Sequence, residues 1–295
     1  MYSLELAADG RSLDSILIKD FGLLSDSVGD RASELVLGIF GDEIASGKYR
    51  FKFDTSRYSM QWEEFKEELK HENRFFPRNT VISKILTPAG ASPEFGVFSG
   101  LLAQLSYSLE AGVRLFRARV SDQPLNKSQM GMPGKTIASG GRANPVGIPY
   151  LYLAENRDTC IAEVRPSNAS TVYISEFVLG CDLKLLDLTN PRSESSSVAF
   201  EENQTEDVLC FLELLERFSF ELSKPVLPEK SHLEYIPTQY ICEFVKSFSG
   251  YQGIIFKSSF GSGKNFVIFS DESFEACEPL TGRVVRTQHE FHVDG

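Results

Sequence analysis

The sequence predicts an α+β fold in which a helical N-terminal domain precedes a domain that contains a β-sheet. Apolar residues recur with helical spacing up to about residue 110, and the apolar/polar alternation typical of strands begins after Gly112. The chain has 295 residues, more than one domain usually has, and 42% of them are hydrophobic, enough to form a core. We therefore expect an all-helical domain over residues 1–110 and a sheet domain over residues 111–295.

The N-terminal half shows several amphipathic segments. Residues 13–24 and 30–40 have helical apolar spacing. Further along, Trp62, Phe65 and Leu69 fall on one helical face, and charged residues cover the other. Ser92 can cap another helix, with Pro93 at its first position. This pattern predicts helices that pack against one another, separated by a connection at residues 87–93.

Strand-like runs dominate the rest of the chain. Residues 112–120 alternate, residues 121–139 form a polar loop, and Asn156 can cap a helix that Pro166 ends. An acidic, polar excursion occupies residues 191–206. The further expected strands span residues 150–154, 171–179, 183–188, 253–256, 265–269 and 281–293, and the further expected helices span residues 208–222 and 237–248.

The charge balance limits the function classes. Thirty basic and forty-one acidic residues give a net charge of -11 and a pI near 5.0, which argues against a protein that binds the phosphate backbone of nucleic acid. An anion site must then be a local basic pocket. No secretion signal is recognisable at the N-terminus and no apolar run is long enough for a membrane span, so we expect a cytoplasmic protein.

Three familiar motifs fit the sequence poorly. Residues 261–265, GSGKN, lack the first glycine and the final Ser or Thr of a phosphate-binding P-loop, and they are predicted to form a hairpin turn. The four histidines have no metal-site spacing, so no metal is expected. The Arg286/His292 pair has the letters of a helical nuclease motif, but it lies in a predicted strand.

The candidate site residues begin with two arginines on one predicted strand. Arg117 and Arg119 share a strand face and suit an anion, although two surface arginines on an edge strand would give the same pattern. The stretch 140–166 adds Arg142, Asn144 and a glutamate, Glu163, on a predicted helix. A strand and helix of this kind can hold a phosphate and a sugar together.

The chain from about residue 111 resembles the RES domain family, which is named for an arginine, a glutamate and a serine. The matching pieces are LFRARV, GRANPVGIPYLYLAENRDTCIAEV, DLKLLDLT, YIPTQYICEFV and GIIFKSSFGSGKNFVIF, and their order and spacing carry the resemblance. Ala143 stands where the family often has an aromatic residue, a change expected to alter packing more than chemistry. The helical region before residue 110 faintly resembles the N-terminal region of longer family members, which suggests a regulatory or oligomerising role.

The resemblance implies a mixed β-sheet fold like that of ADP-ribosyltransferases and an activity that consumes NAD+. Known members are bacterial toxins that are paired with an Xre-type antitoxin. By motif, Arg117, Arg142 and Tyr152 correspond to residues that bind the dinucleotide. Glu163 and Ser258 correspond to the family's Glu and Ser and are the expected catalytic residues, with Ser258 able to donate to the nicotinamide ribose or amide. Asn144 is a further candidate contact to the dinucleotide, and Ser259 is the weaker match for the serine.

These residue types suit cleavage of the nicotinamide glycosidic bond. Guanidinium groups bind a pyrophosphate bidentately, and a carboxylate stabilises an oxocarbenium-like state. NAD+ is then a substrate, with inorganic phosphate as an alternative acceptor to water, and no cofactor is expected. Transfer of ADP-ribose to a macromolecule and a non-catalytic nucleotide-sensing module are the alternatives. A homodimer is expected only because two-fold oligomers are the commonest.

Overall fold

The chain folds as two units, each of which is formed from two separate stretches of sequence. The computed structural model describes residues 3–24, 26–29, 31–78, 80–86 and 92–287. The first unit comprises Met1–Ser106 and Asn190–Glu221, and the second comprises Tyr107–Thr189 and Leu222–Gly295. The excursion after Thr189 therefore belongs with the N-terminal residues, whereas the sequence analysis placed it in the second domain.

The first unit is mainly helical, as expected, but it also contains a two-stranded antiparallel sheet. The prediction of an all-helical domain therefore missed two strands, β1 and β2. Short 3-10 turns at Asp26–Val28, Ser197–Ala199 and Glu202–Gln204 connect longer elements. The strands and helices are β1 (Leu4–Ser12), α1 (Leu13–Lys19), α2 (Arg31–Phe40), α3 (Asp42–Ala45), β2 (Lys48–Phe51), α4 (Arg57–His71), α5 (Thr80–Ile85), α6 (Pro93–Gln104) and α9 (Thr205–Ser223).

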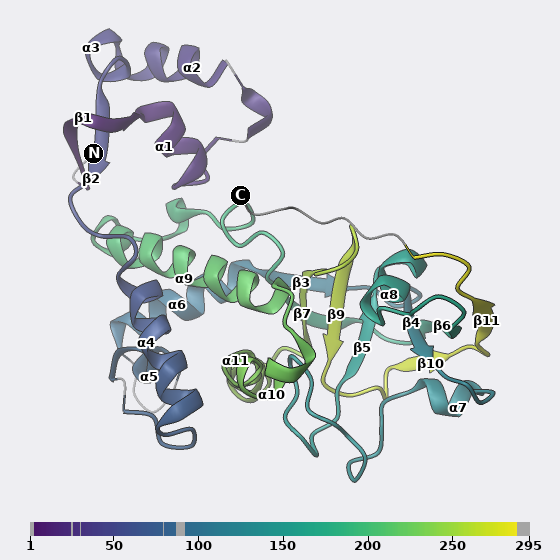
Figure 1. Cartoon of the computed structure of the whole chain (residues 1–295). Helices are drawn as coiled ribbons and strands as arrows, with labels where there is room; N and C mark the ends of the chain where they lie inside the picture. The colour runs from purple at the N-terminus through teal and green to yellow at the C-terminus, as the bar shows by residue number, and fades with distance from the viewer. Residues whose placement is uncertain (1–2, 25, 30, 79, 87–91, 288–295) are drawn as a thin grey trace, which may run out of the picture. The chain divides into compact units, whose positions relative to one another are not determined.

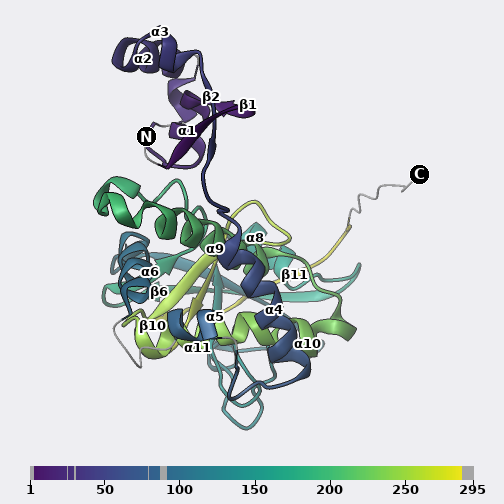
Figure 2. The ribbon, with the colours of Figure 1, turned by 90° about the vertical axis from the view of Figure 1, so that its left-hand side faces the viewer.

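Helix α4 packs on α9 through the apolar face that the sequence predicted (Figure 1, Figure 2). The rings of Tyr58 and Phe211 are stacked 4.3 Å apart, and Trp62 meets Phe218 edge-on at 4.8 Å. Ser92 caps α6 as expected, because its side chain accepts a hydrogen bond from the amide of residue 95. Aromatic pairs of this kind stabilise a packed interface beyond the area that they bury.

The second unit is built around a mixed sheet, which confirms the predicted fold class. Within the described residues the sheet has nine strands in the order β10-β6-β4-β5-β9-β8-β7-β3, and β11 also pairs with β6. Strands β7 and β8 pair parallel, whereas the pairs β4–β6, β4–β5, β5–β9 and β8–β9 are antiparallel. The elements are β3 (Ser106–Leu109), β4 (Arg114–Val120), α7 (Lys127–Met130), β5 (Leu151–Ala154), α8 (Arg157–Glu163), β6 (Thr171–Leu179), β7 (Leu183–Asp187), α10 (Ser231–Glu234), α11 (Ile236–Phe248), β8 (Gly253–Lys257), β9 (Lys264–Ile268), β10 (Phe274–Ala276) and β11 (Leu280–Arg283).

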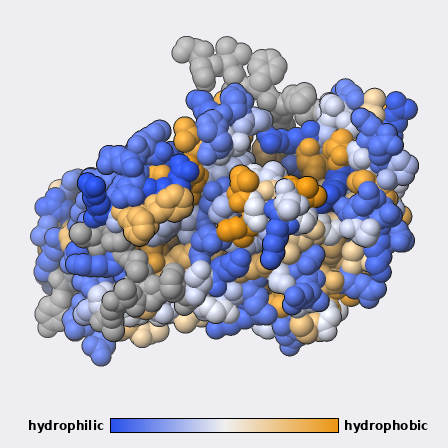
Figure 3. Space-filling view, turned by 90° about the horizontal axis from the view of Figure 1, so that it is seen from below, coloured by the Kyte–Doolittle hydropathy of each residue, from blue (hydrophilic) through white to orange (hydrophobic). Residues whose placement is uncertain are grey.

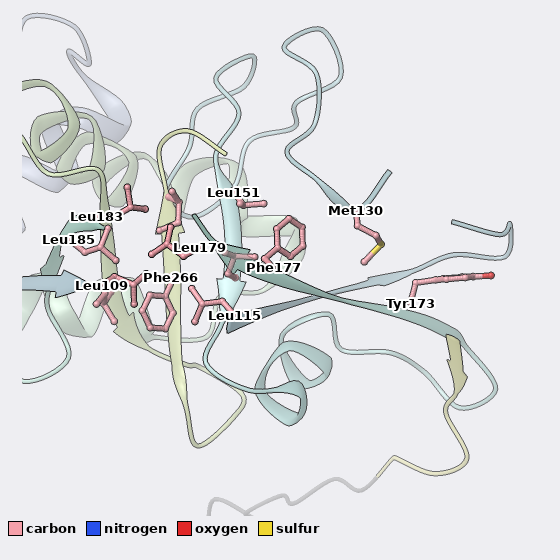
Figure 4. Close-up of a cluster of buried hydrophobic side chains, with 13 residues drawn as sticks. Leu109, Leu115, Met130, Leu151, Tyr173, Phe177, Leu179, Leu183, Leu185 and Phe266 are labelled. Carbon is pink, nitrogen blue, oxygen red and sulfur yellow. The ribbon is translucent and has the colours of Figure 1, made fainter. Parts of the chain in front are cut away.

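The two faces of this sheet bury different sets of side chains. Figure 4 shows the larger cluster, in which Leu115, Leu151, Phe177 and Phe266 come together from four strands. On the other face Ala118 and Ala154 pack with residues of α8, a helix that contacts β4, β5 and β6. The two faces bury different residues because neighbouring strand residues point to opposite faces. The small side chains under α8 allow this helix to lie close to the sheet.

Two segments differ from their predicted structure. The expected loop at residues 121–139 contains α7, whose capping box joins Asn126 and Gln129, and Met130 of this helix is buried in the core. The expected final strand at 281–293 ends at Arg283 in β11, and its last six residues lie outside the described part of the chain.

The surface agrees with the acidic, polar composition. On the face shown in Figure 3, hydrophobic residues stand in small groups among hydrophilic ones. No helix within the described residues combines the length and the apolar character needed to cross a membrane.

Candidate functional site

A pocket of about 330 Å³ lies in the second unit, between the sheet, α8 and the loop before β5. Its volume is at the low end of the range for small-molecule sites. Backbone or side-chain atoms of β4, β5 and β9 form its floor, and aromatic rings form part of its wall. The charged and polar lining residues are Arg117, Arg142, Tyr152, Glu163, Arg165, Tyr235 and Asn265.

Glu163 is the last residue of α8, and its carboxylate is held at the pocket wall. The helix begins at a cap in which the Asn156 side chain accepts a hydrogen bond from the amide of Thr159 at 2.8 Å, as the sequence predicted. Oε1 of Glu163 accepts hydrogen bonds from Ser258 Oγ at 2.5 Å, from Asn265 Nδ2 at 2.7 Å and from a backbone amide, that of residue 259, at 3.2 Å. Because Oε1 takes all three bonds, Oε2 is the atom that can face a ligand.

Ser258 lies in the turn between β8 and β9, where its hydroxyl forms all the hydrogen bonds that it can make. Its hydroxyl donates to Glu163 and accepts from the amides of Phe260 and Gly261 at 3.1 and 2.8 Å. The sequence analysis expected Ser258 to contact the substrate, but the structure places it behind the carboxylate and not in the pocket wall. Its one proton orients Glu163.

The glycine-rich GSGK segment forms the hairpin turn that the sequence predicted. Strands β8 and β9 on either side are antiparallel, and the amide of Gly263 donates to Thr159 Oγ1 at 3.2 Å. A Cβ atom at Gly263 would lie 2.6 Å from that hydroxyl oxygen. Glycine is therefore needed because the turn rests directly on α8, which brings Ser258 to Glu163.

Arg142 lies in the loop before β5, which α11 holds in place. Thr238 Oγ1 donates to the Arg142 carbonyl at 2.6 Å, and Gln239 Nε2 donates to the carbonyl of Gly141 at 2.8 Å. The guanidinium lies 5.3 Å from the ring centroid of Tyr235, a cation–π contact. Burial lowers the pKa of Arg142, an effect that Tyr235, Glu163 and Tyr152 oppose. The side chain nevertheless stays a cation at neutral pH, because an arginine begins from a pKa above 12.

Tyr152, which lines the pocket, and the buried Asn144 form a hydrogen-bonded pair beside Arg142. The Tyr152 hydroxyl donates to Asn144 Oδ1 at 2.7 Å and accepts from the amide of Ala143 at 3.0 Å, and burial raises its pKa. Asn144 Nδ2 donates to the carbonyls of Ser139, Pro145 and Ile148. Every polar atom of the Asn144 side chain thus has a partner within the protein, and only 4% of this residue is exposed. Asn144 therefore shapes the loop, which does not agree with its prediction as a direct contact to the dinucleotide.

Arg117, on β4, brings a largely buried guanidinium to the pocket. Burial and the nearby charge of Arg119 lower the pKa of Arg117 to about 10, and Tyr152 and Asp271 offset this only in part. Its Nη1 atom is buried without a hydrogen-bond partner among the described residues. A buried cationic donor that lacks a partner is costly, and an anionic ligand would satisfy it.

Arg119 does not join Arg117 at the pocket. Its guanidinium donates to the carbonyl of Gly131 at 3.0 Å and so holds the loop that follows β4. The strand that carries both arginines lies between β6 and β5, which excludes the edge-strand alternative. Of Arg117 and Arg119, only Arg117 lines the site.

The sequence analysis missed several residues that complete the site. Tyr235 and Asn265 line the pocket, and Thr238 and Gln239 hold the loop of Arg142. All of them stand inside or next to the family-like pieces YIPTQYICEFV and GKNFVIF. Nothing local indicated that their side chains meet a loop about 100 residues away.

A metal-dependent site has no support within the described residues. No three or more His, Cys, Asp or Glu side chains among them lie close enough together to hold a metal ion. The charged groups of the pocket are three arginines and one glutamate, and arginine is not a metal ligand. The donor set of this pocket suits an anion.

Comparisons with known proteins place the chain in a family. A solved structure of the M. tuberculosis MbcT–MbcA toxin–antitoxin complex contains a chain that is 14% identical to this one; the match covers 64% of this chain and 92% of that chain, with a TM-score of 0.32. No curated protein matches the sequence. The family model of the RES domain matches residues 114–294, which is more than half of the chain. The chain belongs to the RES domain family.

Proposed function

We propose that this protein binds NAD+ in the pocket of the second unit and cleaves the bond between nicotinamide and ribose. The observation that carries the proposal is the fixed carboxylate of Glu163 in a pocket whose lining also includes three arginines and several aromatic rings. Family membership supports it, because the resemblance implies an NAD+-consuming activity. Cleavage of this kind needs an anion beside a developing positive charge and cations beside a pyrophosphate.

The cations of the pocket suit the pyrophosphate of NAD+. Arg117, Arg142 and Arg165 line it together with one carboxylate, Glu163, so the lining carries a net charge of about +2 at neutral pH. A guanidinium binds phosphate oxygens in bidentate fashion and stays protonated. Within a chain of net charge -11, this local excess of positive charge favours a ligand with two phosphates.

The cavity volume suits one half of the dinucleotide. About 330 Å³ accommodates nicotinamide and its ribose, so we place the adenosine half toward the open side. The ring of Tyr235 offers an aromatic wall, and it already holds the guanidinium of Arg142. We infer that Arg142 and Tyr235 act together, with the cation on the phosphates and the ring against the sugar or base.

Glu163 would act on the ribose. When the glycosidic bond breaks, its electron pair stays with nicotinamide, which leaves as a neutral base, and the ribose becomes oxocarbenium-like. A carboxylate oxygen near that sugar stabilises the positive charge. Water then adds to give ADP-ribose and a proton, or phosphate adds to give ADP-ribose 1″-phosphate. Ser258 and Asn265 keep Oε1 occupied, so that Oε2 faces the sugar in one orientation.

The same resemblance suggests the biological setting. An enzyme that consumes NAD+ without restraint would be toxic to a cell, and family members are paired with Xre-type antitoxins. We propose that this protein acts as such a toxin and that a protein inhibitor of this kind is its partner. The first unit, which lies mostly outside the family match, is proposed to have a regulatory or oligomerising role.

The direct test is to incubate purified protein with NAD+ labelled in the nicotinamide ring, with and without inorganic phosphate, and to identify the products. Release of nicotinamide with ADP-ribose indicates hydrolysis, and release with ADP-ribose 1″-phosphate indicates phosphorolysis. A second label in the adenine ring that stays on protein would favour the transferase alternative. Binding of NAD+ without any product would favour the nucleotide-sensing module.

The matched variant for this assay is Glu163→Gln, which keeps the size of the side chain and removes its charge. We expect turnover to fall by about two to three orders of magnitude, which corresponds to about 3 to 4 kcal/mol of transition-state stabilisation. Binding of ADP-ribose should persist, because the arginines remain. Turnover equal to that of the wild type in this variant would rule out the assigned role of Glu163.

A further inference from the structure

Arg165 follows α8 directly, and its backbone has an unusual conformation. Its φ angle is 43°, in the left-handed region, and its amide donates to the carbonyl of Ala162 at 3.1 Å. Helices often end in a left-handed residue, and glycine is favoured there because it has no Cβ atom to clash. An arginine in this place carries a steric cost that a glycine would avoid. We therefore expect the arginine side chain to have a role that offsets this steric cost.

The contacts of the Arg165 side chain suggest that role. Its guanidinium lies 4.9 Å from the ring centroid of Phe260, and both residues line the pocket. Phe260 stands in the β8–β9 turn and is 38% exposed, and Arg165 is also exposed. The pair therefore stands where the pocket opens to solvent. A cation held over a ring keeps its outer edge free to bind an anion.

The charges deeper in the pocket leave a role for a third cation. Arg117 and Arg142 are partly buried, whereas Arg165 is exposed. Arg165 also lies near enough to Arg142 for its charge to lower the pKa of that side chain further. Two arginines that repel each other across a pocket are stabilised when a phosphate group lies between them.

We propose that Arg165, held over Phe260, is a phosphate-binding residue at the mouth of the pocket and contacts the phosphate that lies nearer to solvent. This inference rests on the proposed function, because it takes the ligand to be a dinucleotide or its ADP-ribose product. It adds a residue that the sequence analysis did not single out. The side chain recognises phosphate charge, and the left-handed backbone after α8 aims it.

Arg157, the first residue of α8, provides a matched control. It is also an exposed arginine whose guanidinium stands over a phenylalanine ring, that of Phe116, at 5.5 Å. It does not line the pocket, and its Nη2 atom lies 4.0 Å from a carboxylate oxygen of Glu176. Removing Arg157 changes the net charge of the protein as much as removing Arg165 does. Differences between the two variants therefore report on position and not on total charge.

The experiment measures binding by calorimetry and stability by thermal unfolding for wild type, Arg165→Gly and Arg157→Ala. The ligands are ADP-ribose, which has two phosphates, and nicotinamide riboside, which has none. We expect Arg165→Gly to weaken ADP-ribose binding by about ten-fold, as for a lost hydrogen bond to a charged group, and to leave the binding of nicotinamide riboside unchanged. Its melting temperature should equal or exceed that of the wild type, because glycine relieves the backbone. Arg157→Ala should not change either affinity.

Each other outcome overturns the inference in a recognisable way. Unchanged ADP-ribose affinity in Arg165→Gly would show that the residue binds no phosphate. An equal loss for both ligands, or a loss accompanied by a lower melting temperature, would show a structural role only. Wild-type protein that does not bind ADP-ribose would overturn the proposed function and this inference together, whereas wild-type binding with an unaffected Arg165→Gly variant would overturn only the inference.

Discussion

Two cationic side chains, Lys66 in the first unit and Arg117 in the second, differ in whether the protein supplies a partner for their buried atoms. In the first unit, Lys66 Nζ lies 2.7 Å from Glu221 Oε1 and 2.7 Å from Glu63 Oε2, and the side chains of Lys66 and Glu221 are 9% and 3% exposed. In the second unit, Arg117 has a buried Nη1 atom with no hydrogen-bond partner among the described residues. One cation is neutralised within the protein. The buried Nη1 atom of Arg117 is left for a ligand.

This difference separates structural charge from functional charge. A buried ion pair recovers the cost of its desolvation through its partner, so that Lys66 and Glu221 contribute to the packing of α4 on α9. Burial lowers the pKa of Arg117 to about 10, a sign that its charge is not fully compensated within the protein. A protein can retain an incompletely compensated charge where a bound ligand compensates it.

The largest effect on stability is expected from breaking the pair in the first unit. Glu221→Gln leaves the Lys66 charge with Glu63, which is half exposed, and should lower the free energy of unfolding by about 3 kcal/mol. Denaturant unfolding followed by circular dichroism measures this. The control is the double variant Lys66→Met with Glu221→Leu, which removes both charges and should be near the wild type in stability. A Glu221→Gln protein as stable as the wild type would contradict the comparison.

A smaller effect of opposite sign is expected in the second unit. Arg117→Met removes a charge that forms no ion pair with a carboxylate among the described residues, so the ligand-free protein should become more stable by about 1 kcal/mol. The same unfolding experiment detects the change. Arg192→Met offers a contrast, because the Arg192 guanidinium forms a two-point ion pair with Glu216 at 2.9 and 2.7 Å and its loss should destabilise the protein. If Arg117→Met destabilises as Arg192→Met does, Arg117 is a structural residue.

The smallest effect is a dependence of ligand binding on pH. Because the protonated guanidinium binds phosphate and the pKa of Arg117 is lowered to about 10, the affinity for ADP-ribose should fall as the pH rises through that value. The loss should be about two-fold at pH 10 and steeper above it. Calorimetric titrations from about pH 8 upward, with circular dichroism to confirm folding, measure it. In Arg117→Met this dependence should disappear, and its persistence would assign it to another group.

Much of the sheet and of the site was predictable from the sequence, because both depend on local patterns. The alternation in β4, the capped helix α8 and the hairpin turn all follow from short-range spacing, and the structure confirms them. The family resemblance pointed to Arg117, Arg142, Tyr152 and Glu163, and the structure brings them to one pocket. Proximity of four residues from β4, β5, α8 and a loop was an expectation that only coordinates test.

The remaining features depend on hydrogen bonds between distant residues, which spacing does not reveal. Asn144 and Ser258 were predicted to touch the substrate, yet their side chains are occupied by Tyr152 and Glu163. The 190–221 segment was included in the predicted sheet domain over residues 111–295, whereas the rings of α9 pack on α4 in the first unit. The types of side chain indicated the chemistry of the site. The hydrogen-bond partner of each side chain depends on the fold and could not be predicted from spacing.

The central claim is that Arg117 is kept unpaired for an anionic ligand, and ligand-dependent unfolding tests it most directly. The free energy of unfolding is measured with and without NAD+ in Glu163→Gln, which should bind NAD+ and consume it only slowly, and in the double variant Glu163→Gln with Arg117→Met. At NAD+ about one hundred times above its dissociation constant, the single variant should gain about 2.7 kcal/mol, and the double variant should gain much less. Equal gains in both variants, or no gain in Glu163→Gln, would contradict the account.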